Sequence, residues 1–229
     1  MWTVRVFTLY PELFPGPLNS GLYKKALEKK IWSLEVINIR NFTFDKHNTV
    51  DDTPFGGGSG MLMRADVIAN ALDKNISDIN EKIIYLSPKG KKFDQVYAKK
   101  IMNKNLNILC GHFEGVDQRL LETRNIEEVS VGDFVLSGGE VGALVIIDTI
   151  VRLLPGVLGN YNSLKEETFE GNLLEYPQYT KPQKWEKKEV PEVLLSGDHS
   201  KIKGWRLTQS EDITRRRRPD LWEKYKRKK

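Results

Sequence analysis

The feature that most constrains the fold is a regular alternation of short β-rich runs with segments of helical periodicity. Runs rich in β-branched and aromatic residues are typical of strands, and they cover residues 3–9, 33–39, 82–87, 106–110 and 128–132. Apolar side chains recur at helical spacing in residues 21–30, 65–75 and 91–104. This alternation predicts an α/β fold with a mostly parallel sheet. Ligands of such sheets bind at the carboxyl ends of the strands, so we expect a site in the loops that follow.

The second half of the chain predicts a change of architecture. Residues 139–154 form a helical pattern that is apolar nearly all round, which indicates burial in the core or against another subunit. A stretch of Gly, Asn and Ser with weak periodicity follows and reads as a linker. We therefore expect a first domain over 1–158, a linker over 159–172 and a small α-helical domain over 173–229.

Charge is distributed unevenly along the 229 residues. Residues 181–229 hold 16 Lys/Arg against 8 Asp/Glu, whereas the preceding 180 residues hold 20 against 23. A basic segment after an acidic-to-neutral body favours a polyanion as the partner of the C-terminal part. A well-solvated helical surface would give the same composition, so charge alone leaves both interpretations open.

Membrane, disulfide and zinc chemistry are not expected. The most apolar segment, 142–159, is interrupted by Asp148, Arg152 and Pro155, and the N-terminus lacks the pattern of a signal peptide. The single cysteine, Cys110, excludes an internal disulfide and fits a reducing compartment. One Cys and three scattered His offer no zinc-ligand spacing. We expect a soluble cytoplasmic protein.

A glycine-rich stretch, "DDTPFGGGSGMLMRAD", covers residues 51–66. A phosphate-binding P-loop would need Lys-Ser or Lys-Thr after Gly60, and a dinucleotide fingerprint would need a glycine where Met61 stands. The two acidic residues at its start would also repel phosphate. A flexible surface loop remains the alternative to a binding loop.

Three of the predicted strands end in unusual loops. They are "YLSPKG" (85–90), "CGHFEGVDQR" (110–119) and "SVGDFVLSGGE" (130–140), each with Gly or Pro where the strand ends. Each one alone is typical of an ordinary turn. Three such loops at consecutive strand ends favour one shared ligand.

These loops, together with "PFGGGSGMLM", "RLLPGVLG", "LLEYPQYTKP", "VPEVLLSGDHSKIKGWRL" and "RRRPDL" in this order, resemble the bacterial tRNA (guanine-N1)-methyltransferases. That family modifies the guanosine 3′-adjacent to the anticodon and belongs to the knotted SPOUT class. The resemblance spans nearly the whole chain. It implies a deep trefoil knot, S-adenosyl-L-methionine (SAM) as methyl donor, and a Mg²⁺ requirement whose ligands the sequence does not place.

The resemblance also implies which residues hold the cofactor, largely through main-chain groups. Leu86 and Leu136 would sandwich the adenine, and Glu114 would meet the sulfonium charge or a ribose hydroxyl. The implied cofactor-binding residues are Tyr85, Leu86, Ser87, Pro88, Gly111, Phe113, Glu114, Ser130, Val131, Gly132, Phe134, Leu136, Gly138 and Gly139.

The target guanine is expected beside Gly56, Gly57, Gly58 and Ser59, where absent side chains leave room for a flat purine. Guanine N1 carries a proton at neutral pH, and its removal pushes negative charge onto O6. Such chemistry needs a carboxylate near N1 and a cation near O6.

We assign Glu167 as general base and Arg152 as the O6 stabiliser. The family has Asp at the position of Glu167, and the neighbouring Glu166 is an alternative base. For Arg152, a salt bridge at a helix C-terminus is the alternative interpretation.

The C-terminal part is expected to bind tRNA phosphates through Lys201, Lys203, Arg206, Arg215 and Arg217. Trp205 would stack on a base, or else anchor a small helical core. The resemblance further implies a homodimer whose active site is shared between subunits. Two other functions remain open: another knotted RNA methyltransferase with a ribose or rRNA target, and a non-enzymatic RNA-binding protein of the same fold.

Overall fold

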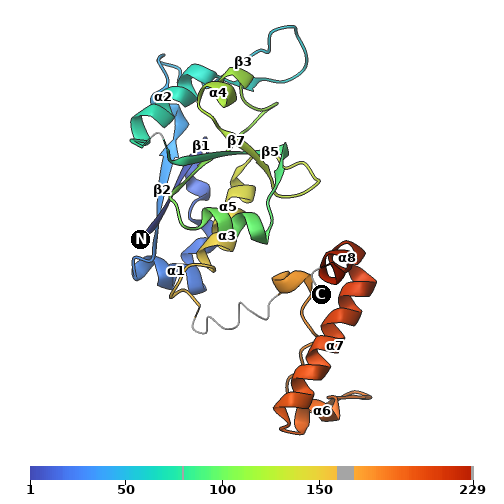
Figure 1. Ribbon diagram of the computed structural model, residues 1–229. Helices are drawn as coiled ribbons and strands as arrows, with labels where there is room; N and C mark the ends of the chain where they lie inside the picture. Colours follow the sequence, from blue (N-terminus) through green and yellow to red (C-terminus); the bar gives the residue numbers. More distant parts are fainter. Residues whose placement is uncertain (79, 159–167, 228–229) are drawn as a thin grey trace. The chain divides into compact units, whose positions relative to one another are not determined.

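The computed structural model describes residues 1–78, 80–158 and 168–227. The chain divides into two compact units, Met1–Gly159 and Asn160–Lys229, which we call unit 1 and unit 2 (Figure 1). Most of the predicted linker lies outside the described residues, so the predicted domain boundaries stay a prediction.

Unit 1 is built on a five-stranded sheet of order β2-β1-β6-β5-β7, in which every neighbouring pair is parallel. The predicted α/β class with a mostly parallel sheet is therefore confirmed. The strands are β1 (Trp2–Thr8), β2 (Trp32–Asn38), β5 (Lys82–Lys92), β6 (Leu106–Leu109) and β7 (Glu127–Ser130). Each overlaps one of the five predicted strands.

Helices cover both faces of this sheet, with α2 and α4 on one side and α1, α3 and α5 on the other (Figure 1). The helices are α1 (Gly21–Glu28), α2 (Ala65–Asn75), α3 (Gln95–Ile101), α4 (Gln118–Thr123) and α5 (Glu140–Val151). Short elements complete the unit: β3 (Asp51–Asp52) pairs antiparallel with β4 (Leu62–Met63), and 3₁₀ turns cover Pro11–Leu13, Gly16–Asn19 and Ile39–Phe42.

One predicted helix begins too early. Residues 91–104 were expected to be helical throughout, but Lys91 and Lys92 belong to β5, which resumes its pairing with β7 after a register shift. Helix α3 begins only after Asp94, whose carboxylate accepts the backbone N–H of Tyr97 at 2.8 Å. This capping bond fixes the start of the helix, and a periodicity search over short windows does not detect it.

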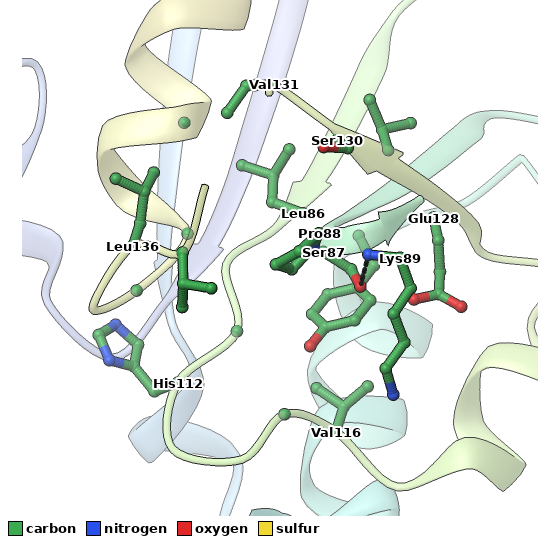
Figure 2. A pocket seen from close by; sticks show the side chains of 18 of the residues that line it. Leu86, Ser87, Pro88, Lys89, His112, Val116, Glu128, Ser130, Val131 and Leu136 are labelled. Atoms are coloured by element: carbon green, nitrogen blue, oxygen red, sulfur yellow. Dashed lines mark hydrogen bonds between the residues drawn. The ribbon is translucent and has the colours of Figure 1, made fainter. Parts of the chain in front are cut away.

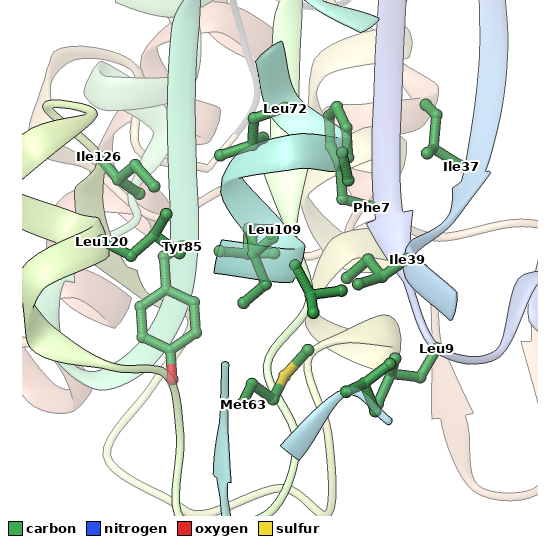
Figure 3. Close-up of a cluster of buried hydrophobic side chains, with 14 of the residues drawn as sticks. Phe7, Leu9, Ile37, Ile39, Met63, Leu72, Tyr85, Leu109, Leu120 and Ile126 are labelled. Atoms are coloured by element: carbon green, nitrogen blue, oxygen red, sulfur yellow. The ribbon is translucent and has the colours of Figure 1, made fainter. Parts of the chain in front are cut away.

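The core of unit 1 lies on both faces of the sheet, as expected for parallel strands. On one face, Phe7 and Leu109 pack with Ile68 and Leu72 of α2 (Figure 3). On the other, Val6 of β1 is fully buried, as are the isoleucines of α5. Because the described helices cover both faces, a ligand site is expected at the edges or the strand ends of the sheet.

Unit 2 is a small helical unit with little buried interior. A short hairpin, β8 (Lys184–Trp185) and β9 (Lys188–Glu189), precedes α6 (Glu192–Leu195), α7 (His199–Arg217) and α8 (Pro219–Lys226), and a 3₁₀ turn covers Glu170–Asn172. Thr214 of α7 is buried; its hydroxyl donates to Ser210 O and accepts the backbone N–H of Leu174 at 2.8 Å. Among its described residues, Leu221 is the one buried hydrophobic side chain, so much apolar surface stays accessible.

Candidate functional site

A cavity of about 320 Å³ lies beside the register shift of β5, between Leu86 and Lys91, and at the carboxyl ends of its neighbours β6 and β7. Its walls come from the three stretches that the sequence singled out, although residues 85–90, expected as a loop, belong to β5. All fourteen residues expected to hold the cofactor line this one cavity. In Figure 2, Leu86 of β5 lies on one side of this space, and Val131 and Leu136 of the loop after β7 lie around it.

Glycine lets two of these loops, the one after β6 and the one before α5, lie in close contact. The backbone N–H of Gly139 donates to Gly111 O at 3.0 Å. A Cβ on Gly139 would lie 2.7 Å from Cys110 Cα, a distance that side chains do not tolerate. Glycine at this position therefore allows the loop before α5 to lie directly against the loop after β6.

A buried polar network behind the cavity was not predicted. Glu140, at the first turn of α5, is 2% exposed. Its Oε2 lies 2.7 Å from His112 Nε2, and its Oε1 accepts the hydroxyl of Thr8 at 2.6 Å. The hydroxyl oxygen of Thr8 in turn accepts the backbone N–H of Tyr10 at 2.9 Å. Through these hydrogen bonds, Glu140 links His112 to Thr8 of β1.

Nothing local in the sequence signals this network, because Thr8, His112 and Glu140 come from three distant segments. Figure 2 labels His112, beside the loop that carries Leu136. The ring of Tyr10 packs against that of His112 with centroids 4.8 Å apart. His112 is also a lining residue that the resemblance did not supply.

Electrostatics around the cavity argue against a cysteine nucleophile. Burial, reinforced by the nearby Glu140, raises the pKa of Cys110 well above its usual value, so the thiol stays protonated and poorly nucleophilic. Burial, with a smaller effect of Glu128, also raises the pKa of Tyr85. Two carboxylates, Glu114 and Glu128, and one cation, Lys89, line the cavity. The site can accept a ligand that carries positive charge and polar hydroxyls.

The glycine-rich loop lies next to this cavity. Backbone N–H groups of Met63 and Glu114 donate to Gly115 O and Met61 O, both at 2.9 Å, so β4 pairs with the loop after β6. At Gly60, φ is +90° and a Cβ would lie 2.5 Å from Glu114 Cγ.

Gly56, Gly57 and Gly58 have a different explanation. They have positive φ, and a Cβ on any of them would meet nothing within 4 Å. Backbone conformation, rather than crowding within the chain, requires glycine at these three positions. The adjoining Ser59 is exposed, so the space beside this stretch is open. A guanine pocket here stays a prediction.

Of the two residues assigned to catalysis, Arg152 is described by the structure and lies away from the cavity. Glu167, like its alternative Glu166, lies outside the described residues. Arg152 follows the last residue of α5, at the opposite end of that helix from the cavity. There it lies near Tyr23 of α1 and Asp148; burial and a hydrogen bond to Asp148 raise the pKa of Tyr23 to about 12, and the charge of Arg152 opposes that rise.

The basic residues expected to meet tRNA lie on α7. Lys201, Lys203, Arg215 and Arg217 are exposed. Lys201 and Arg215 form ion pairs with Asp198 and Asp212, 3.3 and 2.8 Å long. Arg206 differs, because it is half-buried and its guanidinium lies 4.7 Å from the ring centroid of Tyr176.

Within the described ranges, no group of three or more His, Cys, Asp or Glu is placed to hold a metal ion. The described helices include none that is long and apolar enough to span a bilayer.

Comparisons with known proteins agree with the resemblance. Residues 1–224 match the family model described as tRNA (Guanine-1)-methyltransferase TrmD. A tRNA (guanine-N(1)-)-methyltransferase of Pelagibacter ubique is 66% identical over 228 residues, which cover 99% of this chain and 100% of that protein. Enzymes with the same name from Bartonella tribocorum and Wolbachia pipientis wMel are 55% and 53% identical, each covering 96% of this chain and 95% of the relative.

Proposed function

The chain belongs to the tRNA (guanine-1)-methyltransferase family, and from that premise we propose how it moves a methyl group from SAM to N1 of a tRNA guanine. The proposed target is the guanosine 3′-adjacent to the anticodon. The observation that carries this function is that all fourteen predicted cofactor residues line a single cavity. The single cysteine is a buried free thiol, which agrees with a reducing, cytoplasmic location.

The cavity fits the methyl donor. Its volume is within the range of small-molecule sites, and Leu86, Val131 and Leu136 offer apolar faces for an adenine ring. Glu114 and Glu128 provide acceptors for ribose hydroxyls and negative charge for a cationic ligand. When bound there, SAM supplies a methyl group already activated by its sulfonium. The remaining work of the chain is to align the guanine and to handle its N1 proton.

In the proposed mechanism, Glu167 takes the proton from guanine N1, and Arg152 stabilises the negative charge that develops on O6. Glu166 is the alternative base. The family has the shorter Asp at position 167, and Glu moves the carboxylate by about one bond length. Displacements of roughly 1 Å can cost on the order of a hundredfold in rate, so the segment around Glu167 must adjust to the longer side chain.

Arg152 supports an active site shared between two copies of the chain. Gly142 is the last residue of α5 that lines the cavity, and Arg152 lies ten residues beyond it. Ten residues correspond to about 15 Å along the helix axis. An arginine side chain cannot span that distance back to the cavity of its own chain. In the proposed homodimer, Arg152 of one subunit therefore completes the cavity of the other.

Exposed apolar side chains support the same homodimer. Val141 and Val145 of α5 are 57% and 47% exposed, and Val135 at the rim of the cavity is 84% exposed. An apolar strip of this kind beside a ligand site is typical of an interface. A two-fold axis would bury the strip of both copies at once.

The trefoil knot is part of the proposal. Its support is the contact between Gly139 and the backbone of Cys110, which lets the chain after β7 pass tightly against the loop after β6. The glycine-rich loop with Gly56, Gly57, Gly58 and Ser59 is proposed to receive the target guanine, because β4 joins it to the cavity wall.

Unit 2 is proposed to bind tRNA phosphates. Arg215 follows Lys201 by about four helical turns, so the two share a face of α7, and Arg217 follows Lys203 by the same interval. Cations thus extend along two faces of one helix. Arg206, with its guanidinium over Tyr176, joins them from a half-buried position.

The direct test uses methyl-labelled SAM and unmodified tRNA transcripts with or without the guanosine 3′ of the anticodon. We expect 1-methylguanosine in digests of the first transcript alone. A methyl group on another atom or at another nucleotide would replace this target with a ribose or rRNA-type activity of the same class.

The shared site is tested by mixing two inactive variants. Arg152→Ala removes the O6 stabiliser, and Leu136→Arg blocks the cavity from a partly exposed position. Co-expressed subunits should regain about a quarter of wild-type activity, because half of the dimers are mixed and each holds one intact site. No regain would show that each chain uses its own Arg152.

A further inference from the structure

A second cavity lies entirely within unit 2, and nothing so far has given it a role. Its volume is about 430 Å³. Its walls are the segment 176–183, helix α6 and the first two turns of α7. Val190, Leu194 and Ile202 supply an apolar floor.

Three aromatic rings line this cavity. Tyr179 and Trp205 lie with their centroids 6.3 Å apart and tilted by 55°. The third, Tyr176, is covered on one side by the guanidinium of Arg206 at 4.7 Å. Tyr179 is 48% exposed, so a flat ligand can reach its ring from solvent. Accessible aromatic faces beside a cation are the components of a nucleobase-stacking site.

Charge narrows the class of ligand. The described lining contains two cations, Lys181 and Arg206, and no carboxylate. Lys201 and Lys203 lie on the adjoining turn of α7. Gln183 of the lining carries an amide that can donate to or accept from the edge of a base, whereas the amide of Gln178 already donates to Glu175. A ligand with a flat ring and an attached negative charge fits this set best.

We propose that this cavity binds one unpaired nucleobase of the tRNA, stacked on Trp205 and Tyr179, with an adjoining phosphate facing Lys181 and Arg206. The inference rests on the proposed function, because that function makes tRNA the substrate. It adds a second anchoring point, on a different unit from the methyl transfer. Phosphate contacts on α7 orient the tRNA without reading its sequence, whereas a captured base can also distinguish one nucleotide from another.

The first experiment measures the affinity for an unmodified tRNA transcript by filter binding at several salt concentrations. Trp205→Ala should weaken binding about tenfold, within the range of base–aromatic stacking, and Trp205→Phe should recover most of the loss. The matched control is Trp185→Ala, since Trp185 is exposed on β8 of the same unit and outside the cavity lining.

The salt dependence separates stacking from charge. Trp205→Ala should leave the slope of log affinity against log salt unchanged, whereas Lys201→Ala should reduce it by about 0.7 to 0.9 for one phosphate lost. A changed slope in Trp205→Ala would overturn the stacking assignment. So would a wild-type affinity in that variant, or a loss of dimer in chromatography without a loss of tRNA binding, because the cavity would then serve a protein contact.

The second experiment keeps the protein unaltered and therefore does not depend on how a variant folds. Transcripts with a single abasic site at each unpaired position are titrated against the wild-type chain. One position should lose about tenfold in affinity, and that loss should vanish against Trp205→Ala. Equal affinity for all transcripts would overturn the inference. A failed proposed function is recognised separately, because the wild-type chain would then form no 1-methylguanosine.

Discussion

Replacement of Glu140 tests whether the buried network behind the cavity is what holds its walls together. Glu140→Ala removes the partner of the Thr8 hydroxyl and of His112 Nε2, which lie 2.6 and 2.7 Å from the carboxylate. Each buried group left without a partner costs about 1–3 kcal/mol, and breaking a buried ion pair, which Glu140 and His112 form when His112 is protonated, costs about 3–5 kcal/mol. We therefore expect the free energy of unfolding to fall by about 3–5 kcal/mol.

Glu140→Gln should be milder. Its carbonyl oxygen can still accept from Thr8, so the expected loss is about 1–2 kcal/mol, from the contact with His112 and the lost charge at the start of α5. Both variants should bind SAM more weakly, because His112 is part of the cavity wall.

The assay is urea denaturation at one fixed protein concentration, since a dimer makes apparent stability concentration-dependent. Glu122→Ala is the control, because Glu122 is an exposed carboxylate and should change stability by less than about 0.5 kcal/mol. If Glu140→Ala unfolds within about 0.5 kcal/mol of the wild type, the network does not hold the loops, and the reasoning fails.

Three further outcomes are expected. Gly139→Ala should abolish SAM binding in calorimetry, because its Cβ would lie 2.7 Å from Cys110 Cα; a variant that binds normally would contradict the tight passage of the two loops. Gly60→Ala should raise the KM for SAM more than it lowers kcat, since its Cβ would displace the side chain of Glu114, which lines the cavity, at a positive φ; unchanged kinetics would refute this. Burial raises the pKa of Tyr23 from 10.0 to about 12, so between these pH values the folded chain keeps a proton that the unfolded chain releases. The contribution of Tyr23 to stability is therefore fully present below pH 10 and is lost as the pH rises to 12. Tyr23→Phe should therefore show a flatter dependence of unfolding free energy over that range, and parallel curves for the two proteins would remove this assignment.

Much of unit 1 followed from local pattern alone. All five strands of the sheet were predicted, because β-branched and aromatic runs of four to eight residues between turns leave few alternatives. Helix α2 was predicted with its observed bounds, residues 65–75. The side-chain cap from Asp94 to the Tyr97 backbone explains why α3 starts later than its periodicity indicated.

The position of the site also followed from the sequence, although its internal order did not. Parallel strands bring their carboxyl ends to one edge, so three unusual loops after three strands had to meet once the strands were adjacent. The family resemblance implied that main-chain groups hold the ligand. The link from Glu140 to His112 and Thr8 could not be predicted, because it joins segments that only folding brings together.

The sequence by itself determined the fold class, the family and the three lining stretches, because these depend on periodicity and on motifs whose residues are contiguous in the chain. The tertiary structure decided which side chains share a cavity and how far Arg152 lies from that cavity. Arg152 stands at the far end of α5 from the cavity, a separation set by the rigid rise of the helix. The aromatic cavity of unit 2 likewise exists only once the segment 176–183 lies against α7, because side chains distant in sequence become one surface only by packing.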